Sequence, residues 1–370
     1  MTTTHPLSPR EIIDVYALTQ HICTVHDIRE EDGAVIATVT PLVASAILLR
    51  SVQVRARANG FTAWLRRNPH SKAVELLFIV GVPPTTATRP WLALALFVTT
   101  ILSCLAAGAF YQGIDVFAQP GQIWAGIPFA ATLIGILATH ELGHYIVGRW
   151  WGASVSLPYF IPLPPPLSFT GTMGAVIVQR EPMQDRRVLF DVGVAGPIAG
   201  LVVAVPLLLY GLAQSTVGPL PVDGYMQEGN SALYLLAKLA VFGQILPANN
   251  MDVQLSDVAF AAWIGLLVTM FNLLPIGQLD GGHVAYAVLG RYAIYVAYGA
   301  IAFCVLLGVF VDNTWLVWGV IATLANPRHP APYDDITPIG GWRVLLACLM
   351  VVVLLFLLTP VPIRVVMPSV

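Results

Sequence analysis

The pattern of hydrophobic and polar positions changes near residue 90. Before that point, three segments alternate apolar and polar residues as half-buried strands do, namely residues 34–40, 61–67 and 73–80. Residues 42–58 instead carry apolar and basic residues at helical spacing. We therefore expect a small soluble module with the order β-α-β-β at about residues 30–80, with a helix before it.

Beyond residue 90 the apolar segments are long enough to cross a membrane. Residues 91–111 form the first run that reaches the roughly 20 apolar residues needed by a spanning helix. The further candidates are residues 124–149, 188–212, 258–279, 292–311 and 342–360, and a shorter segment at 314–326. The pattern predicts an all-α polytopic membrane protein with about six or seven transmembrane helices. We expect a soluble α+β module at residues 1–89 and a transmembrane domain at residues 90–370.

Two connecting stretches do not fit a helical pattern. Residues 153–180 hold five prolines and then a run rich in Gly and β-branched residues, which predicts a membrane-associated β-hairpin. Residues 213–257 hold acidic and amide residues around one amphipathic run, which predicts an outer loop with an interfacial helix. His329 and the pair Asp334 and Asp335 are expected on solvated loops.

Composition supports the membrane assignment and excludes other classes. The chain is 57% hydrophobic and 10% charged, against roughly 25% charged residues in ordinary soluble proteins. The net charge of -2 and the lack of a basic cluster exclude nucleic acid as a partner. The four cysteines lie far apart and predict neither a thiolate metal site nor a disulfide framework.

The distribution of basic residues predicts the orientation in the membrane. Residues 1–89 contain 9 of the 18 Lys and Arg residues, and such residues collect on the cytoplasmic side. With the module on that side, the loops that hold Arg180 and Arg291 are cytoplasmic, and residues 213–257 are opposite. The ends of the second and fourth predicted spans then lie at the same side of the bilayer.

The motif His140-Glu141-Leu142-Gly143-His144 lies at the end of the second predicted span. Histidines at positions i and i+4 share one face of a helix, so that their imidazoles can converge on one zinc ion. Glu141 lies beside that face and can accept a proton from the attacking water. Ionisable groups inside an apolar span are costly, which favours a functional centre over helix packing with an internal ion pair.

A catalytic zinc ion takes three protein ligands and keeps one open position, so a third ligand is required. Asp280 is the best candidate, because it follows a span in which Pro275 and Gly277 allow the helix to unwind. Its alternative role is to cap the following helix. His283 is a rival third ligand or a residue that contacts a ligand.

Together the two motifs resemble the site-2 protease family of intramembrane zinc metalloproteases, in its bacterial and plastid-type members. The resemblance rests on HELGH and on NLLPIGQLDGGH at residues 272–283, and it covers the chain from about residue 91. It implies one Zn²⁺ per chain, bound by His140, His144 and Asp280, with Glu141 as the catalytic base. It also implies that Asn272 polarises the scissile carbonyl or orients a ligand.

Two further segments resemble parts of that family. The strand-like segment with Gly171, Thr172, Met173 and Gly174 matches a region after the first motif, and an exposed strand edge could hold an extended substrate. A membrane-dipping structural hairpin is the alternative. The small residues of 195–200 predict close packing of the third span on the metal-bearing helix.

The sequence therefore predicts an intramembrane zinc endopeptidase that cleaves peptide bonds in or near transmembrane segments of membrane proteins. We expect a multi-pass protein of the bacterial inner membrane, with its active site toward the cytoplasmic side and lipid and transmembrane substrates as partners. The oligomeric state is left open. The alternative is a non-proteolytic metal-binding membrane protein or a transporter, which would need ligands but no general base.

Overall fold

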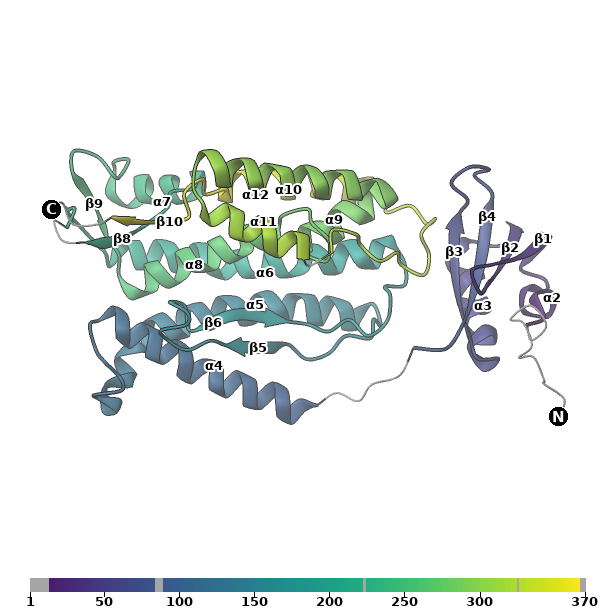
Figure 1. The fold of residues 1–370 in the computed structure, drawn as a ribbon, viewed down its shortest axis with the longest axis horizontal. Helices are drawn as coiled ribbons and strands as arrows, with labels where there is room; N and C mark the ends of the chain where they lie inside the picture. The colour runs from purple at the N-terminus through teal and green to yellow at the C-terminus, as the bar shows by residue number, and fades with distance from the viewer. Residues whose placement is uncertain (1–12, 84–88, 222–223, 325, 367–370) are drawn as a thin grey trace. The chain divides into compact units, whose positions relative to one another are not determined.

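The computed structural model describes residues 13–83, 89–221, 224–324 and 326–366 (Figure 1). The ends of the predicted soluble module, residues 1–12 and 84–88, lie outside the described residues. The chain forms two compact units. The first contains the N-terminal residues to 87 together with Gln179–Phe190 and Pro330–Gly341, and the second contains the rest of the chain.

A four-stranded antiparallel sheet with the order β1-β2-β4-β3 forms the centre of the first unit. Its elements are α2 (Val15–Thr19), β1 (Cys23–Glu31), β2 (Ala34–Pro41), α3 (Ser45–Ala58), β3 (Phe61–Arg67) and β4 (Val74–Val80). Apolar residues of α3 pack on the sheet, and Val35, Leu48, Leu76 and Phe78 are fully buried in the common core. Three strands and the helix lie where the sequence pattern predicts them.

Strand β1 was not predicted, and its composition explains why. The strand contains charged residues at Asp27, Arg29, Glu30 and Glu31, and it lies at the edge of the sheet beside β2. Edge strands tolerate polar residues on both faces, so the alternation that marks a half-buried strand is absent.

Two short segments from distant parts of the chain extend this sheet beyond β3. The amide of Leu65 donates to the carbonyl of Tyr333 (2.7 Å), and the amide of Tyr333 donates to the carbonyl of Met183 (2.9 Å). Asp334 is buried, and its carboxylate accepts hydrogen bonds from the backbone of Ile336 and from Thr337. The expectation of a solvated Asp334 is therefore wrong, because these donors compensate its burial.

The second unit is built mainly of helices, most of which run side by side (Figure 1). They are α4 (Pro90–Tyr111), α5 (Ile127–Trp150), α6 (Arg186–Ala213, whose first turn belongs to the first unit), α7 (Ala232–Phe242), α8 (Asp257–Asn272), α9 (Asp280–Leu289), α10 (Ala293–Phe310), α11 (Thr314–Leu324) and α12 (Gly341–Leu357). Short 3₁₀ helices, η1 (Pro120–Gly126) and η2 (Gly290–Tyr292), precede α5 and α10. Within the described residues, four helical stretches are long and apolar enough to cross a membrane: Pro90–Tyr111, Pro120–Trp150, Arg186–Ala213 and Asp280–Phe310. The mostly helical membrane protein expected from the sequence is therefore present.

The predicted span at residues 258–279 is interrupted. Helix α8 ends at Asn272, and α9 begins at Asp280 after a turn that contains Pro275 and Gly277. Gly277 has a φ of 53°, in the left-handed region that favours glycine. The unwinding expected at these two residues occurs, and it makes Asp280 the first residue of a new helix.

The predicted hairpin consists of β5 (Tyr159–Pro162) and β6 (Thr172–Val176), which pair antiparallel. Strand β5 packs against α4, and β6 contacts α5, so the hairpin lies beside both helices (Figure 1). At Gly171 an added Cβ would lie 2.7 Å from the Cα of Cys104, which shows how closely the hairpin approaches α4.

Residues 214–256 contain helix α7 and contribute three strands to two small sheets. Strand β7 (Thr216–Pro219) pairs with β9 (Met251–Gln254), and β8 (Tyr225–Glu228) pairs with β10 (Ile363–Val366). Lys238 of α7 is fully buried, with its Nζ 3.0 Å from Asp252 Oδ1 and 3.4 Å from Glu228 Oε1. Burial raises the pKa of Glu228, and the charge of Lys238 opposes that rise. The amphipathic run thus covers an internal ion cluster.

Candidate metal centre

Helix α5 positions the two histidines of the HELGH motif on one buried face. His140 and His144 lie one turn apart, and their Nε2 atoms are 3.2 Å from each other. Both side chains are almost excluded from solvent, and so is Glu141 between them. The helical spacing therefore gives the convergence of imidazoles that the sequence predicts.

The turn after α8 brings Asp280 to this pair. Its Oδ2 lies 3.1 Å from His140 Nε2, and its Oδ1 lies 3.2 Å from His144 Nε2. No side-chain cap closes the start of α9, so the carboxylate of Asp280 is directed at the two histidines. The three residues form a group whose ligand atoms could hold one metal ion.

The geometry of this group fits zinc. Nitrogen and oxygen ligands at about 2.1 Å in a tetrahedral arrangement lie about 3.4 Å apart. The two Nε2 atoms lie 3.2 Å apart, and each faces a different oxygen of Asp280, His140 at 3.1 Å from Oδ2 and His144 at 3.2 Å from Oδ1, all close to that value. A donor set of two imidazoles and one carboxylate leaves a fourth position, as catalytic zinc sites do.

The orientation of His144 is fixed by the backbone of α6. Its Nδ1 lies 2.7 Å from the carbonyl oxygen of Val192. Because a carbonyl can only accept, Nδ1 carries the proton, and the lone pair of Nε2 faces Asp280 and His140. A neutral imidazole in this tautomer is the form that binds a metal ion.

Asn272, the last residue of α8, also reaches the group. Its Nδ2 lies 3.4 Å from His140 Nε2. An amide so placed can donate to an oxygen bound beside the histidines. The role of Asn272 stays a prediction, and the structure adds its proximity to a predicted ligand.

His283 is not one of the three converging residues. Its Nδ1 lies 2.6 Å from Nε2 of His329, whose ring stacks on Tyr286 with centroids 4.8 Å apart. His329 is therefore not a simple surface residue, and the expectation of a solvated loop is wrong for it, because the ring packs on α9. Asp280, and not His283, belongs to the group that could hold a metal.

The predicted substrate-binding strand has one exposed side. Met173 of β6 is 68% exposed, while Thr172 is buried and donates to the carbonyl of Ile161 on β5 (2.9 Å). Gly174 has a φ of 100°, and a Cβ added there would meet nothing within 4 Å, so the space beside this backbone is open. These features suit an edge that accepts another strand, and the role of Gly171 to Gly174 stays a prediction.

The small residues of α6 lie directly on the metal group. A Cβ at Gly196 would lie 2.0 Å from His144 Nε2, and a Cβ at Gly143 would lie 2.6 Å from the carbonyl oxygen of Ala195. The close packing that residues 195–200 predict is present. Nothing in the sequence indicates, however, that Gly196 faces a ligand atom.

The chain is similar in sequence to known proteins. The sequence model of peptidase family M50 matches residues 128–308, which include both motifs. Among curated proteins, the probable zinc metalloprotease EGY1, chloroplastic, is 29% identical in Arabidopsis thaliana over 75% of this chain and 54% of its own length. The EGY1 protein of Oryza sativa subsp. japonica is 28% identical over 75% of this chain and 51% of its own length.

The likeness covers only part of these proteins. The chain spans about half the length of the curated relatives it matches. No solved structure matches the chain significantly. The resemblance to the site-2 proteases that the two motifs predict is nevertheless confirmed by the match of residues 128–308 to peptidase family M50.

Proposed function

We propose that this chain is an intramembrane zinc endopeptidase that cleaves peptide bonds in or near transmembrane segments of membrane proteins. One observation carries the proposal: His140, His144 and Asp280 converge within 3.2 Å of one another, with Glu141 next to His140 on an apolar helix. The relatives named zinc metalloproteases support both the metal and the reaction.

Different residues of this site would have different roles in peptide hydrolysis. His140, His144 and Asp280 would hold a zinc ion, which would supply a Lewis acid able to polarise the scissile carbonyl and activate water. Glu141 accepts the proton of the attacking water and returns it to the leaving amine. Asn272 donates to the oxygen on which negative charge develops. The packed helices limit the entry of bulk water.

The substrate must reach this group in an extended form. A transmembrane helix hydrogen-bonds its own peptide groups, so it has to unwind before a backbone carbonyl becomes accessible. The free side of β6 offers main-chain partners to an unwound segment. We therefore propose that substrates have residues of low helix propensity near the cleaved bond.

The finer topology is also a proposal. The six or seven spans would place the N-terminal module at residues 1–89 and the loops of Arg180 and Arg291 on the cytoplasmic side, and residues 213–257 on the other side. The charge distribution supports this orientation. A bacterial inner membrane is our proposal for the location, whereas the relatives carry the word chloroplastic in their names.

Replacement of Glu141 by Gln tests the reaction. The amide has the shape of the carboxylate but cannot accept the proton, so cleavage should fall about 100-fold or more while zinc stays bound. Cleavage of co-expressed single-span membrane proteins and zinc content would both be measured. Glu228→Gln is the matched control, because it changes a carboxylate outside the motifs whose side chain is only 10% exposed, and it leaves Asp252 paired with Lys238. Wild-type cleavage by Glu141→Gln would favour a non-proteolytic metal-binding protein or a transporter.

Single cysteines test the topology. A cysteine at residue 60 and one at residue 230 should react with an impermeant thiol reagent from opposite sides of sealed vesicles. Reaction of both from the same side would contradict the proposed orientation.

A further inference from the structure

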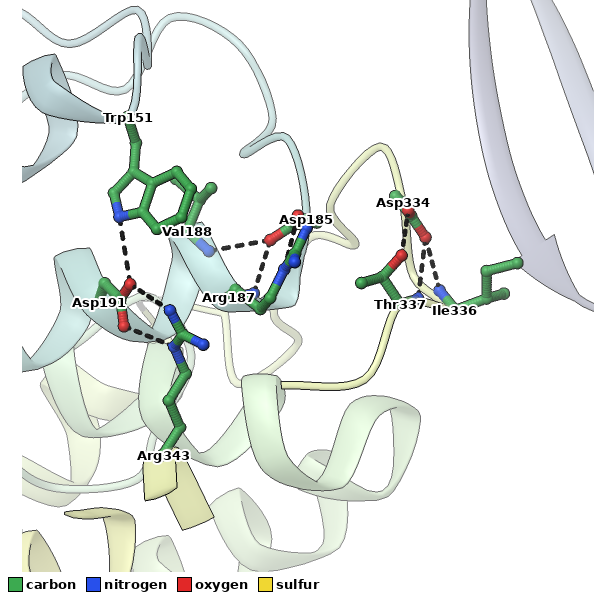
Figure 2. A network of polar contacts seen from close by, with 9 residues as sticks. All are labelled: Trp151, Asp185, Arg187, Val188, Asp191, Asp334, Ile336, Thr337 and Arg343. Atoms are coloured by element: carbon green, nitrogen blue, oxygen red, sulfur yellow. Dashed lines mark hydrogen bonds and ion pairs between the residues drawn. The ribbon is translucent and has the colours of Figure 1, made fainter. Parts of the chain in front are cut away.

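A buried ion pair lies next to the backbone that orients His144. Asp191 of α6 accepts two hydrogen bonds from Arg343 of α12, one from Nε to Oδ1 and one from Nη2 to Oδ2, each 2.7 Å (Figure 2). The side chains of Arg343 and Asp191 are 11% and 15% exposed. Two parallel hydrogen bonds between a guanidinium and a carboxylate fix direction as well as distance.

A residue at the end of α5 also contacts this ion pair. The indole Nε1 of Trp151, the C-cap residue of α5, donates to Oδ2 of Asp191 at 3.1 Å (Figure 2). The guanidinium of Arg343 also lies 4.3 Å from the ring centroid of Trp342. The carboxylate of Asp191, near the beginning of α6, therefore contacts residues at the end of α5 and at the beginning of α12.

Two routes lead from Asp191 to His144. Along α6, the next residue is Val192, whose carbonyl oxygen accepts the proton of His144 Nδ1 at 2.7 Å. Along α5, Trp151 lies about two turns after His144, at about 3.6 residues a turn. Asp191 is thus linked to both residues of the hydrogen bond between His144 and Val192. It is the chain neighbour of Val192, and it contacts Trp151 of the helix that carries His144.

A role in positioning explains the pair better than a role in stability alone. A buried ion pair returns little net stability compared with apolar residues of the same volume, because both charges lose their hydration. Metal ligands, by contrast, tolerate displacements of only about 0.2 Å. The two hydrogen bonds between Arg343 and Asp191 fix the backbone beside the Val192 carbonyl, and that carbonyl in turn holds His144 with the required precision.

We infer that Asp191, fixed by Arg343 and Trp151, is a positioning residue for His144 and tunes how the centre binds its metal. The inference rests on the proposed function. It makes Asp191 and Arg343 determinants of metal affinity although neither touches the metal group.

The test measures metal binding in a background that cannot cleave. In Glu141→Gln protein, the affinity for Zn²⁺ and the visible absorption spectrum of bound Co²⁺ report the ligand geometry without any peptidase activity. Asp191→Asn should weaken zinc binding about 10-fold, the lower end of the loss when a direct partner of a ligating histidine is changed, because Asp191 acts through Val192. The Co²⁺ spectrum should change with it.

Further variants separate positioning from unfolding. Arg343→Lys keeps the charge but not the fork, so it should lose less affinity than Arg343→Gln. The double variant Asp191→Asn/Arg343→Gln leaves no unpaired charge and should lose no more than the worse single variant, because both act through one pair. Trp151→Phe removes a single N–H and serves as the mild test if the others fail to fold.

Arg186→Gln is the matched control. It breaks an ion pair with Asp335 at the beginning of the same helix, 2.8 Å long and 23% and 20% exposed, without touching His144 or Val192. Wild-type affinity and spectrum in Asp191→Asn, Arg343→Gln and Trp151→Phe would overturn the inference, as would an equal loss in Arg186→Gln. A parent protein that binds neither metal would instead overturn the proposed function, and the inference with it.

Discussion

Replacement of Gly196 by Ala should remove metal binding without weakening the helix that carries it. The added Cβ would lie 2.0 Å from His144 Nε2 and 2.5 Å from the neighbouring ring carbons Cδ2 and Cε1. An ordinary contact needs about 3.4 Å or more, so the ring must move by more than 1 Å. Alanine itself favours a helix over glycine by about 1 kcal/mol.

The metal centre cannot accommodate this displacement of the His144 ring. His144 Nε2 lies 3.2 Å from Asp280 Oδ1 and from His140 Nε2, and a metal bond tolerates only about 0.2 Å. The ring is also held at Nδ1 by the carbonyl of Val192, so a rotation would break that hydrogen bond. We expect zinc affinity to fall at least about 100-fold, or about 2.8 kcal/mol.

Alanine substitutions at two other glycines should have smaller effects on zinc affinity and so provide a comparison series. A Cβ at Gly200 would lie 3.2 Å from His140 Nδ1, so that a shift of a few tenths of an ångström accommodates it and affinity should fall only slightly. A Cβ at Gly135 of α5 would meet nothing within 4 Å and should leave metal binding unchanged. Zinc titration and thermal unfolding of the three alanine variants provide the comparison. Equal affinities in Gly196→Ala and Gly135→Ala would refute the reasoning.

Two further predictions concern the third ligand and the first unit. Asp280→Ala should lower the zinc content, which metal analysis of purified protein checks, and His283→Ala should leave it unchanged; the reverse result would transfer the ligand role. Glu75 is buried, which opposes its ionisation, but hydrogen bonds from Asn68, Arg29 and Arg66 outweigh that effect and lower its pKa below the usual 4.5. A lowered pKa stabilises the fold above about pH 4.5 and is lost as the pH falls through the value in the folded state. Glu75→Gln should therefore destabilise the sheet by about 1–3 kcal/mol at pH 7 and by less at pH 3. Hydrogen exchange of residues 74–80 in variant and parent at each pH checks this, and an equal difference at both values would contradict it.

The metal group could be predicted from the sequence because its parts are local. The spacing of His140 and His144 fixes a common helix face, and Pro275 with Gly277 marks the point at which a span unwinds before Asp280. Both motifs also lie at the ends of apolar segments. Residue spacing, helix-breaking residues and apolar runs are local patterns, so they can be recognised in the sequence without coordinates.

The missed features depend on pairings that leave no local pattern. Asp334 is polar and follows a proline-rich stretch, so nothing marks the hydrogen bonds that bury it beside β3. Asp191 and Arg343 are each a single charge near one end of an apolar run, and only their ion pair in the folded structure shows that they meet. A charge inside a span is a signal that a partner exists, although the sequence does not say which. Likewise, Gly196 and Gly135 look alike in sequence and differ only in what surrounds them.

The buried Lys238 has a practical consequence for work on this protein. The chain has two lysines, and the other, Lys72, is exposed on the turn between β3 and β4. Because Lys238 is fully buried and paired with two carboxylates, amine-reactive reagents should modify the folded protein at Lys72 and, apart from the α-amino group, at no second position. A dye or surface linker attached in this way would sit on the small sheet unit and leave every residue of the metal group unmodified. Modification at Lys238 would in turn report that the 214–256 segment has opened.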